Sequence, residues 1–160
     1  MHFTREKGFG ILIMELKDLY REIVNDHNIN PMYKYEMEDP DIVLRGVNPS
    51  CGDDINLMLK VKDDVITEAS YMGCGCAISQ ASVDMMIDNV TGLSRDDALA
   101  RIEIFLGMIE GTVTDEKELK ELDEAMYLSA ISHMPARVKC AVLGWRTLKK
   151  ILTENTIGNS

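Results

Sequence analysis

The chain has 160 residues, of which 46% are hydrophobic, and its formal net charge at pH 7 is −10. This size and composition indicate a single globular domain with its own hydrophobic core. The excess of negative charge repels phosphate backbones, which argues against nucleic-acid binding, and no apolar run approaches the roughly 20 residues that a membrane-spanning helix needs.

Four cysteines could pair as two disulfides in a secreted domain. A chain of this length buries enough apolar surface to fold without such cross-links. We therefore expect a cytoplasmic protein whose thiols are free for metal binding or sulfur chemistry.

The first predicted element is an amphipathic helix over residues 14–27, preceded by a disordered tail over residues 1–13. The apolar residues of this helix recur at helical spacing and are Leu16, Leu19, Tyr20, Ile23 and Val24. Residues 28–31 predict its end, because they combine asparagine with proline. Residues 32–40 are predicted to be irregular.

Three strands are predicted next. Residues 41–47 are compatible with a short strand, although their periodic signal is weak. Residues 55–61 alternate between apolar and polar side chains, as a half-buried strand does. Residues 63–64 are two aspartates that turn the chain, and residues 65–72 form the returning strand of an antiparallel hairpin.

The predicted hairpin brings two cysteine-containing segments together. In an antiparallel pair, the start of the first strand lies beside the end of the second. Cys51 and Asp53 precede the first strand, and Cys74 and Cys76 follow the second. The topology alone therefore places Cys51, Asp53 and Cys76 close to one another.

Several helices are predicted after the hairpin. Residues 77–90 favour a helix, and Ser94 can cap another that continues to about Glu110. Thr114 can cap a third helix, and the highly charged residues 112–125 are predicted to be exposed to solvent.

A last helix is predicted to begin near Pro135, since proline is favourable in a first helical turn. Its predicted apolar face consists of Val138, Ala141, Val142, Trp145, Leu148 and Leu152. Cys140 lies near the start of this helix, where the helix dipole is expected to stabilise a thiolate. Residues 153–160 are predicted to be a tail, which leaves residues 14–152 as the folded domain.

Three cysteines and one aspartate form a candidate metal site: Cys51, Asp53, Cys76 and Cys140. Thiolates and a carboxylate are suitable ligands for tetrahedral zinc, and thiolates also hold iron–sulfur clusters. The spacing is not that of paired Cys-x-x-Cys knuckles, so spacing alone leaves other interpretations open. Asp53 could cap a turn, and Cys140 could be a small buried core residue.

The residues around these positions resemble the U-type iron–sulfur cluster assembly scaffolds, which include IscU-like proteins and the N-terminal domain of NifU. The resemblance rests on three segments in order, residues 49–53, 75–79 and 136–141, and it extends over residues 16–152. It implies an α+β fold in which a small antiparallel three-stranded sheet is packed on one side by several helices. The metal site is then expected where the sheet and the helices meet.

Two features are more similar to the SufU branch than to the IscU branch. IscU-type chains carry a histidine directly before the last cysteine, where this chain has Lys139. SufU-like chains also have an insertion between the second and third cysteine motifs, and residues 91–125 look like it. Cys74 is extra relative to the family pattern.

The resemblance implies that Cys51, Asp53, Cys76 and Cys140 bind one zinc ion. It also implies that the partner is a SufS-like, pyridoxal-phosphate-dependent cysteine desulfurase whose persulfide sulfur is transferred to this chain, which would then be a sulfurtransferase. We expect Cys51 to accept the sulfur, because it lies on a loop. Arg137 could stabilise the thiolate or persulfide, or form a surface ion pair.

Two alternatives use the same ligands. In one, Cys51, Cys76 and Cys140 hold iron or a [2Fe–2S] cluster that is assembled here and passed to downstream iron–sulfur assembly proteins. In the other, zinc only stabilises the loops around it. Because all three functions use the same ligands, the preference for sulfur acceptance over cluster assembly rests on Lys139 in place of histidine.

Overall fold

The structure, a computed structural model, describes residues 9–154, and it describes side chains from residue 18 onward. In chain order the elements are α1 (Phe9–Ile29), β1 (Ile42–Asn48), β2 (Asp53–Lys62), β3 (Val65–Cys74), α2 (Ala77–Val90), α3 (Arg95–Glu110), α4 (Glu116–Lys120), the 3₁₀ helix η1 (Asp123–Ile131) and α5 (Pro135–Glu154). The three predicted strands and the predicted last helix are all present.

The strands form one antiparallel sheet in the order β1-β2-β3. Asp63 and Asp64 make the turn between β2 and β3, and both have positive φ angles, 52° and 64°. A two-residue hairpin loop with positive φ at both positions matches the right-handed twist of its strands, and aspartate tolerates this conformation better than most residues. The predicted hairpin is therefore confirmed.

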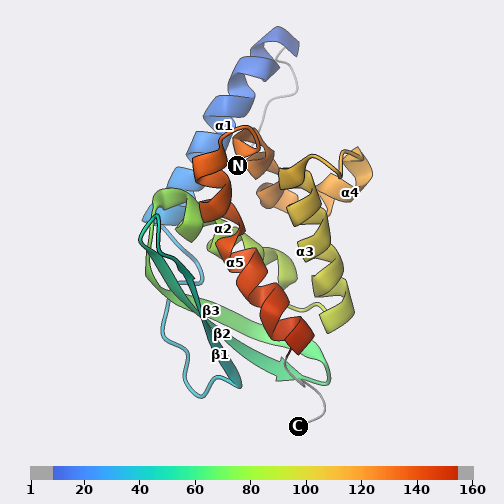
Figure 1. Ribbon diagram of the computed structural model, residues 1–160. Coiled ribbons are helices and arrows are strands. Elements are labelled where there is room, and N and C mark those ends of the chain that lie inside the picture. The colour runs from blue at the N-terminus through green and yellow to red at the C-terminus, as the bar shows by residue number, and fades with distance from the viewer. Residues whose placement is uncertain (1–8, 155–160) are drawn as a thin grey trace.

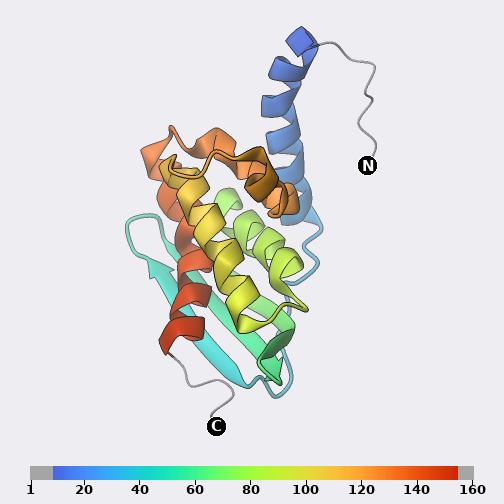
Figure 2. The ribbon, with the colours of Figure 1, turned by 90° about the vertical axis from the view of Figure 1, so that its right-hand side faces the viewer.

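Helices cover one face of the sheet, as predicted. Figures 1 and 2 show α5 and α2 next to the sheet and α3 farther out, and α5 packs against β1, α2 and α3. The core between these layers is continuous, since Phe105 of α3 stacks on the fully buried Trp145 of α5 with ring centroids 4.1 Å apart. The structure confirms the α+β architecture of a sheet with helices on one side.

The helices at both ends of the predicted domain are slightly longer than predicted. At the C-terminal end, α5 continues to Glu154, two residues beyond the predicted end at residue 152. Helix α1 begins at Phe9, five residues before the predicted start, so residues 9–13 are helical and not part of a tail. Its first turns project beyond the rest of the molecule (Figure 1). A packed helix extends at little cost through residues that contain no proline, which accounts for the earlier start. Residues 1–8 and 155–160, the remainder of the predicted tails, lie outside the described residues.

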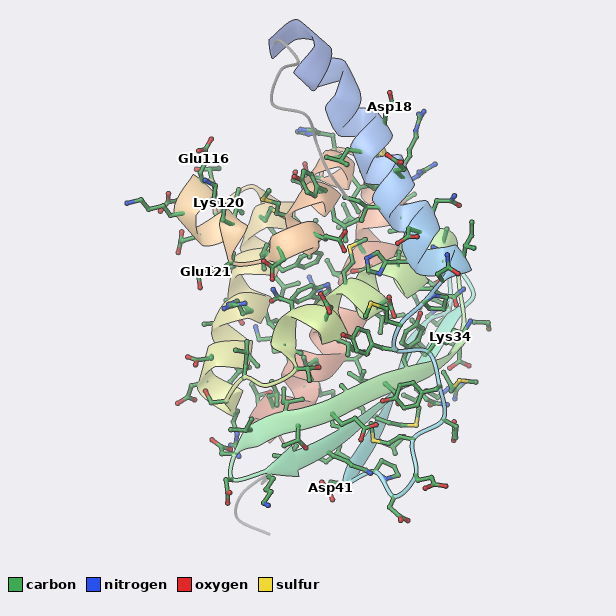
Figure 3. All side chains as sticks on the ribbon, turned by 180° about the vertical axis from the view of Figure 1, so that it is seen from behind. Asp18, Lys34, Asp41, Glu116, Lys120 and Glu121 are labelled. Atoms are coloured by element: carbon green, nitrogen blue, oxygen red, sulfur yellow. The ribbon has the colours of Figure 1, made fainter. Side chains whose placement is uncertain are left out.

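Two predictions for the segment after α3 are corrected. Asp115 caps α4 in place of Thr114, with its side chain accepting a hydrogen bond from the Lys117 amide, and aspartate is the stronger N-cap residue. The charged side chains of α4 do extend into solvent (Figure 3). Leu122, however, is fully buried, because it packs into the core where α4 leads into η1.

A buried charged network ties α1 to the helices behind it. His27 lies near the end of α1, with its Nδ1 2.6 Å from Oδ2 of Asp84 in α2 and its Nε2 2.8 Å from Oε1 of Glu124 in η1. Asp84 is fully buried and also accepts hydrogen bonds from the backbone amides of Met32 and Tyr33. The sequence predicts that His27 caps or pairs at the helix end, and it pairs with two carboxylates at once.

This network predicts a pH-dependent stability. Burial lowers the pKa of His27, but the hydrogen bonds to Asp84 and Glu124 outweigh it and raise the pKa from 6.5 to about 9. Its contribution is therefore fully present below pH 6.5 and lost as the pH rises through about 9. The difference between these two pKa values corresponds to about 3 kcal/mol in the free energy of unfolding. Screening at the half-exposed Glu124 reduces the expected loss of stability to about 2 kcal/mol.

Urea unfolding at a series of pH values from about 6 to 10 measures this loss. The comparison is with His27→Gln, which cannot be protonated at this position, so that contributions from other groups cancel. The wild type should lose stability relative to this variant as the pH rises. Parallel curves for the two proteins would contradict the assigned charge on His27.

Candidate metal centre

The ends of the hairpin and two helices meet at one place in the fold. Cys51 lies in the loop between β1 and β2, and Asp53 is the first residue of β2. The β2–β3 register pairs Asp54 with Cys74, so Asp53 reaches the segment that contains Cys76, directly before α2. Cys140 approaches from α5, which packs against both β1 and α2. The predicted convergence of the first three residues is confirmed, and α5 adds the fourth.

Asp53 is fully buried and only half of its carboxylate is satisfied. Its Oδ1 accepts hydrogen bonds from the Cys76 amide at 2.9 Å and from the Ser79 hydroxyl at 3.1 Å. Its Oδ2 is buried without a hydrogen-bond partner among the residues described. An unpaired buried carboxylate oxygen is costly unless a cation or proton satisfies it. A role in capping a turn accounts only for the hydrogen bonds that Oδ1 accepts. A metal ion bound at Oδ2 would account for the absence of a hydrogen-bond partner there.

Gly75 and Ser79 shape the surroundings of this carboxylate. A Cβ atom added to Gly75 would lie 2.7 Å from Asp53 Oδ1 and 2.5 Å from Ser79 Oγ, so only glycine allows this close approach. Cys76 is the N-cap of α2, and its Sγ accepts a hydrogen bond from the Ser79 amide at 3.4 Å. Ser79 is not among the predicted site residues, although a residue three positions after an N-cap is a recognisable partner for it.

The surroundings of Cys140 disfavour its thiolate, whereas the sequence predicts that the helix dipole stabilises it. The side chain is 5% exposed, and burial, the neighbouring Cys76 and Cys51 thiols and the Asp53 carboxylate together raise its pKa. The predicted help from the helix dipole is small, because Cys140 comes five residues after the start of α5 and the dipole acts mainly over the first turn. A bound cation would counter this and favour the thiolate.

The donor atoms of Cys51, Asp53 and Cys140 all lie within 4.8 Å of one another. The fourth predicted ligand, Cys76, is outside this group but lines the same cavity and neighbours Cys140. Two thiolates and a carboxylate within this distance, with one carboxylate oxygen unpaired, fit the chemistry of a zinc site. The complete set of four ligands stays a prediction.

A cavity of about 540 Å³ opens beside these residues. Cys51, Cys76 and Cys140 line it together with Arg137, which is exposed in the first turn of α5. His133 is exposed and is not in the group of close donor atoms. The extra thiol, Cys74, is exposed at the end of β3.

Helix α1 also lines the cavity, although no sequence motif connects this helix with the site. The wall that it forms consists of Tyr20, Arg21, Val24 and Asn25. The helical spacing of Tyr20 and Val24 predicts a buried face but does not show what that face covers. The role of α1 follows only from the tertiary arrangement.

Comparison with known proteins identifies the class to which this fold and site belong. The sequence profile of the NifU-like N-terminal domain matches residues 19–141. The chain therefore belongs to that family, which includes the IscU and SufU iron–sulfur cluster assembly scaffold proteins.

Individual relatives match over most of their length. The chain is 37% identical to the iron–sulfur cluster assembly scaffold protein IscU of Thermotoga maritima over 87% of this chain and 96% of that protein. It is 38% identical to the zinc-dependent sulfurtransferase SufU of Bacillus subtilis over 90% of this chain and 96% of that protein. A candidate SUF-system scaffold protein, FiSufU from Fervidobacterium islandicum, has a crystal structure that matches with a TM-score of 0.79 and 32% identity over 85% of this chain and 98% of that one.

The similarity to IscU and SufU proteins is thus nearly equal, and the predicted family is confirmed. Within residues 9–154, none of the helices is both long and apolar enough to cross a membrane.

Proposed function

We propose that this protein acts in iron–sulfur cluster biogenesis as a zinc-dependent acceptor of persulfide sulfur from a cysteine desulfurase. The observation that carries the proposal is the combination of one exposed thiol, Cys51, with the buried donors Asp53 and Cys140 within 4.8 Å. Buried donors can retain a metal while the exposed thiol reacts with a partner. The name of the Bacillus subtilis relative, zinc-dependent sulfurtransferase, supports this assignment.

The transfer is a thiol–disulfide type of exchange. The Cys51 thiolate attacks the outer sulfur of the donor's persulfide, the S–S bond of the donor breaks, and the donor's cysteine leaves as a thiolate. Sulfur is transferred without net oxidation or reduction. A bound zinc ion would supply the positive charge that favours thiolates near neutral pH. Arg137, which lines the same cavity, adds a cation that favours the anionic persulfide.

The proposed ligands are Cys51, Asp53, Cys76 and Cys140, and the proposed partners are a SufS-like desulfurase and downstream iron–sulfur assembly proteins in the cytoplasm. The relative exposure of the thiols supports Cys51 as the acceptor, because Cys76 is half-buried and Cys140 is buried. A loop residue also leaves a metal with less disruption than a residue within a helix.

A second candidate function is assembly of a [2Fe–2S] cluster, with iron and sulfide as cargo on the same thiols. The IscU relatives, which are as similar as the SufU relative, favour it. Lys139, in the position where IscU-type chains carry histidine, favours the sulfur-acceptor function. Anaerobic purification from the native host separates the two, because zinc without acid-labile sulfide indicates the acceptor and iron with matching sulfide indicates the scaffold. The exposure of Cys51 argues against zinc that is only structural.

The acceptor assignment predicts that Cys51→Ser loses sulfur loading. With a cysteine desulfurase and cysteine, the variant should acquire persulfide at less than about one hundredth of the wild-type rate, because the attacking thiol is gone. Mass spectrometry of the intact chain measures the added sulfur. Cys74→Ser is the matched control, since Cys74 is also an exposed thiol. It should load normally, because Cys74 is not in the group of close donor atoms. Loading that persists in Cys51→Ser and disappears in Cys76→Ser would reverse the assignment.

A further inference from the structure

The cavity beside the thiols has a wall that sulfur acceptance from a protein donor does not by itself require. Tyr20 and Val24 of α1 are nearly buried and give this wall an apolar surface, while Arg21 and Asn25 are exposed at its edge. With a volume of about 540 Å³, the cavity falls in the range of roughly 300–1,000 Å³ that is typical of small-molecule sites.

The cavity also gathers positive charge in an acidic protein. Arg21 from α1 and Arg137 from α5 both line it, although the chain carries a net charge of −10. Within residues 18–154, the arginines that form ion pairs are Arg45, Arg95 and Arg101. Arg21 and Arg137 are not among them, so their guanidinium groups remain available for an anionic ligand.

The acidic neighbours of Arg21 lie outside this cavity. Asp18 and Glu22 border a separate shallow hollow on α1, which Arg21 and Asn25 also line. Asp18 is exposed on α1 (Figure 3). The cavity that contains the thiols has Arg21 and Arg137 but neither of these carboxylates among its lining residues. Of the charged groups near Arg21, these two guanidinium groups are therefore the ones that a carboxylate in the cavity can reach.

We propose that this cavity binds a small thiol that carries carboxylate groups, and that this thiol removes the sulfur from Cys51. The inference rests on the proposed function, because it names the second substrate of the same site. An apolar wall suits the carbon skeleton of such a thiol, the two guanidinium groups suit its carboxylates, and the cavity brings its sulfur beside Cys51.

The release step balances without an added oxidant or reductant. The thiolate of the small molecule attacks the outer sulfur of the Cys51 persulfide and forms a new S–S bond with it. The bond between that sulfur and Cys51 Sγ breaks, and Cys51 leaves as a thiolate. The product is the persulfide of the small thiol, and the protein is ready to accept sulfur again.

S-methylglutathione is a suitable binding probe, because it has two carboxylates and a methylated sulfur that cannot ligate a metal as a thiolate. Titration calorimetry with the metal-loaded full chain should give saturable binding. Arg21→Gln should weaken it about tenfold, as loss of a charge-assisted hydrogen bond predicts. Arg146→Gln is the matched control, since Arg146 is exposed on α5 and does not line the cavity.

Three outcomes would overturn the proposal: no saturable binding, equal affinity of the wild type and Arg21→Gln, or equal affinity for the probe and its dimethyl ester. A kinetic test follows on protein loaded with persulfide. The ratio of the release rate to glutathione over that to the uncharged 2-mercaptoethanol should fall about tenfold in Arg21→Gln, and an unchanged ratio would also overturn the proposal.

The two proposals fail in different ways. Binding of S-methylglutathione needs no persulfide, so it can be measured even if Cys51 never accepts sulfur. If loading fails, the proposed function is wrong. If loading succeeds and the probe does not bind, the function stands and the small-thiol site is wrong.

Discussion

Asp84→Ala should lower the free energy of unfolding by about 3–5 kcal/mol, the usual cost of breaking a buried ion pair by removing one partner. Asp84 is fully buried, and its carboxylate is the shared acceptor for His27 and for the Met32 and Tyr33 amides. The variant leaves these donors without their acceptor and leaves His27 with Glu124 as its remaining carboxylate.

Urea unfolding followed by far-UV circular dichroism measures this loss. A domain of this size is stable by only about 5–15 kcal/mol, so Asp84→Ala could fail to fold and Asp84→Asn serves as a second variant. Asparagine keeps one acceptor oxygen, and the free energy of unfolding of this variant should lie between those of the wild type and Asp84→Ala. Asp88→Ala is the control one turn later on α2. Its carboxylate accepts an exposed hydrogen bond from Tyr33 Oη, and we expect a loss below about 1 kcal/mol. Equal losses in Asp84→Ala and Asp88→Ala would contradict a central role for the buried network.

This network also matters for the site, because it fixes the end of α1 against α2 and η1. The same helix supplies Tyr20 and Val24 to the wall of the thiol cavity. A loosened α1 would change the shape of this wall while leaving the hairpin and its cysteines in place. Residues that contact neither the metal site nor a ligand can therefore influence what the cavity binds.

The hairpin and its consequence for the site could be predicted from sequence, because both depend on local patterns. Alternating residues define β2, the aspartate pair at residues 63–64 defines the turn, and antiparallel pairing then brings Asp53 to Cys76. Helix α5 was equally visible from Pro135 and its apolar face. In these elements, the periodicity of the apolar residues and the turn or capping residues both agree with the final fold.

The remaining features depend on contacts between distant parts of the chain. His27 and Asp84 are 57 positions apart, and nothing near either residue indicates the other. Leu122 lies in a charged segment, so composition predicted exposure, but its position at the turn from α4 into η1 buries it. Arg21 is unremarkable on an amphipathic helix until α1 is placed against the thiols.

Asp53→Asn should weaken zinc binding by more than about 100-fold, since loss of a group that merely orients a ligand already costs about 10–100-fold. Asparagine retains a side-chain oxygen that can accept from the Cys76 amide and the Ser79 hydroxyl, as Asp53 Oδ1 does. It replaces the unpaired Oδ2 with an amide nitrogen, which cannot serve as an anionic ligand. The local hydrogen bonds should therefore survive while the metal is lost.

Competition with a chelator of known zinc affinity measures this effect, and far-UV circular dichroism verifies that the chain is folded. Asp54→Asn is a close control, because Asp54 is the next residue of the same strand but forms a bidentate ion pair with Arg45 on the exposed side of the sheet. This control should bind zinc like the wild type. If Asp53→Asn also kept its affinity, Asp53 would serve only to cap the turn before α2, and the metal would depend on the three cysteines alone.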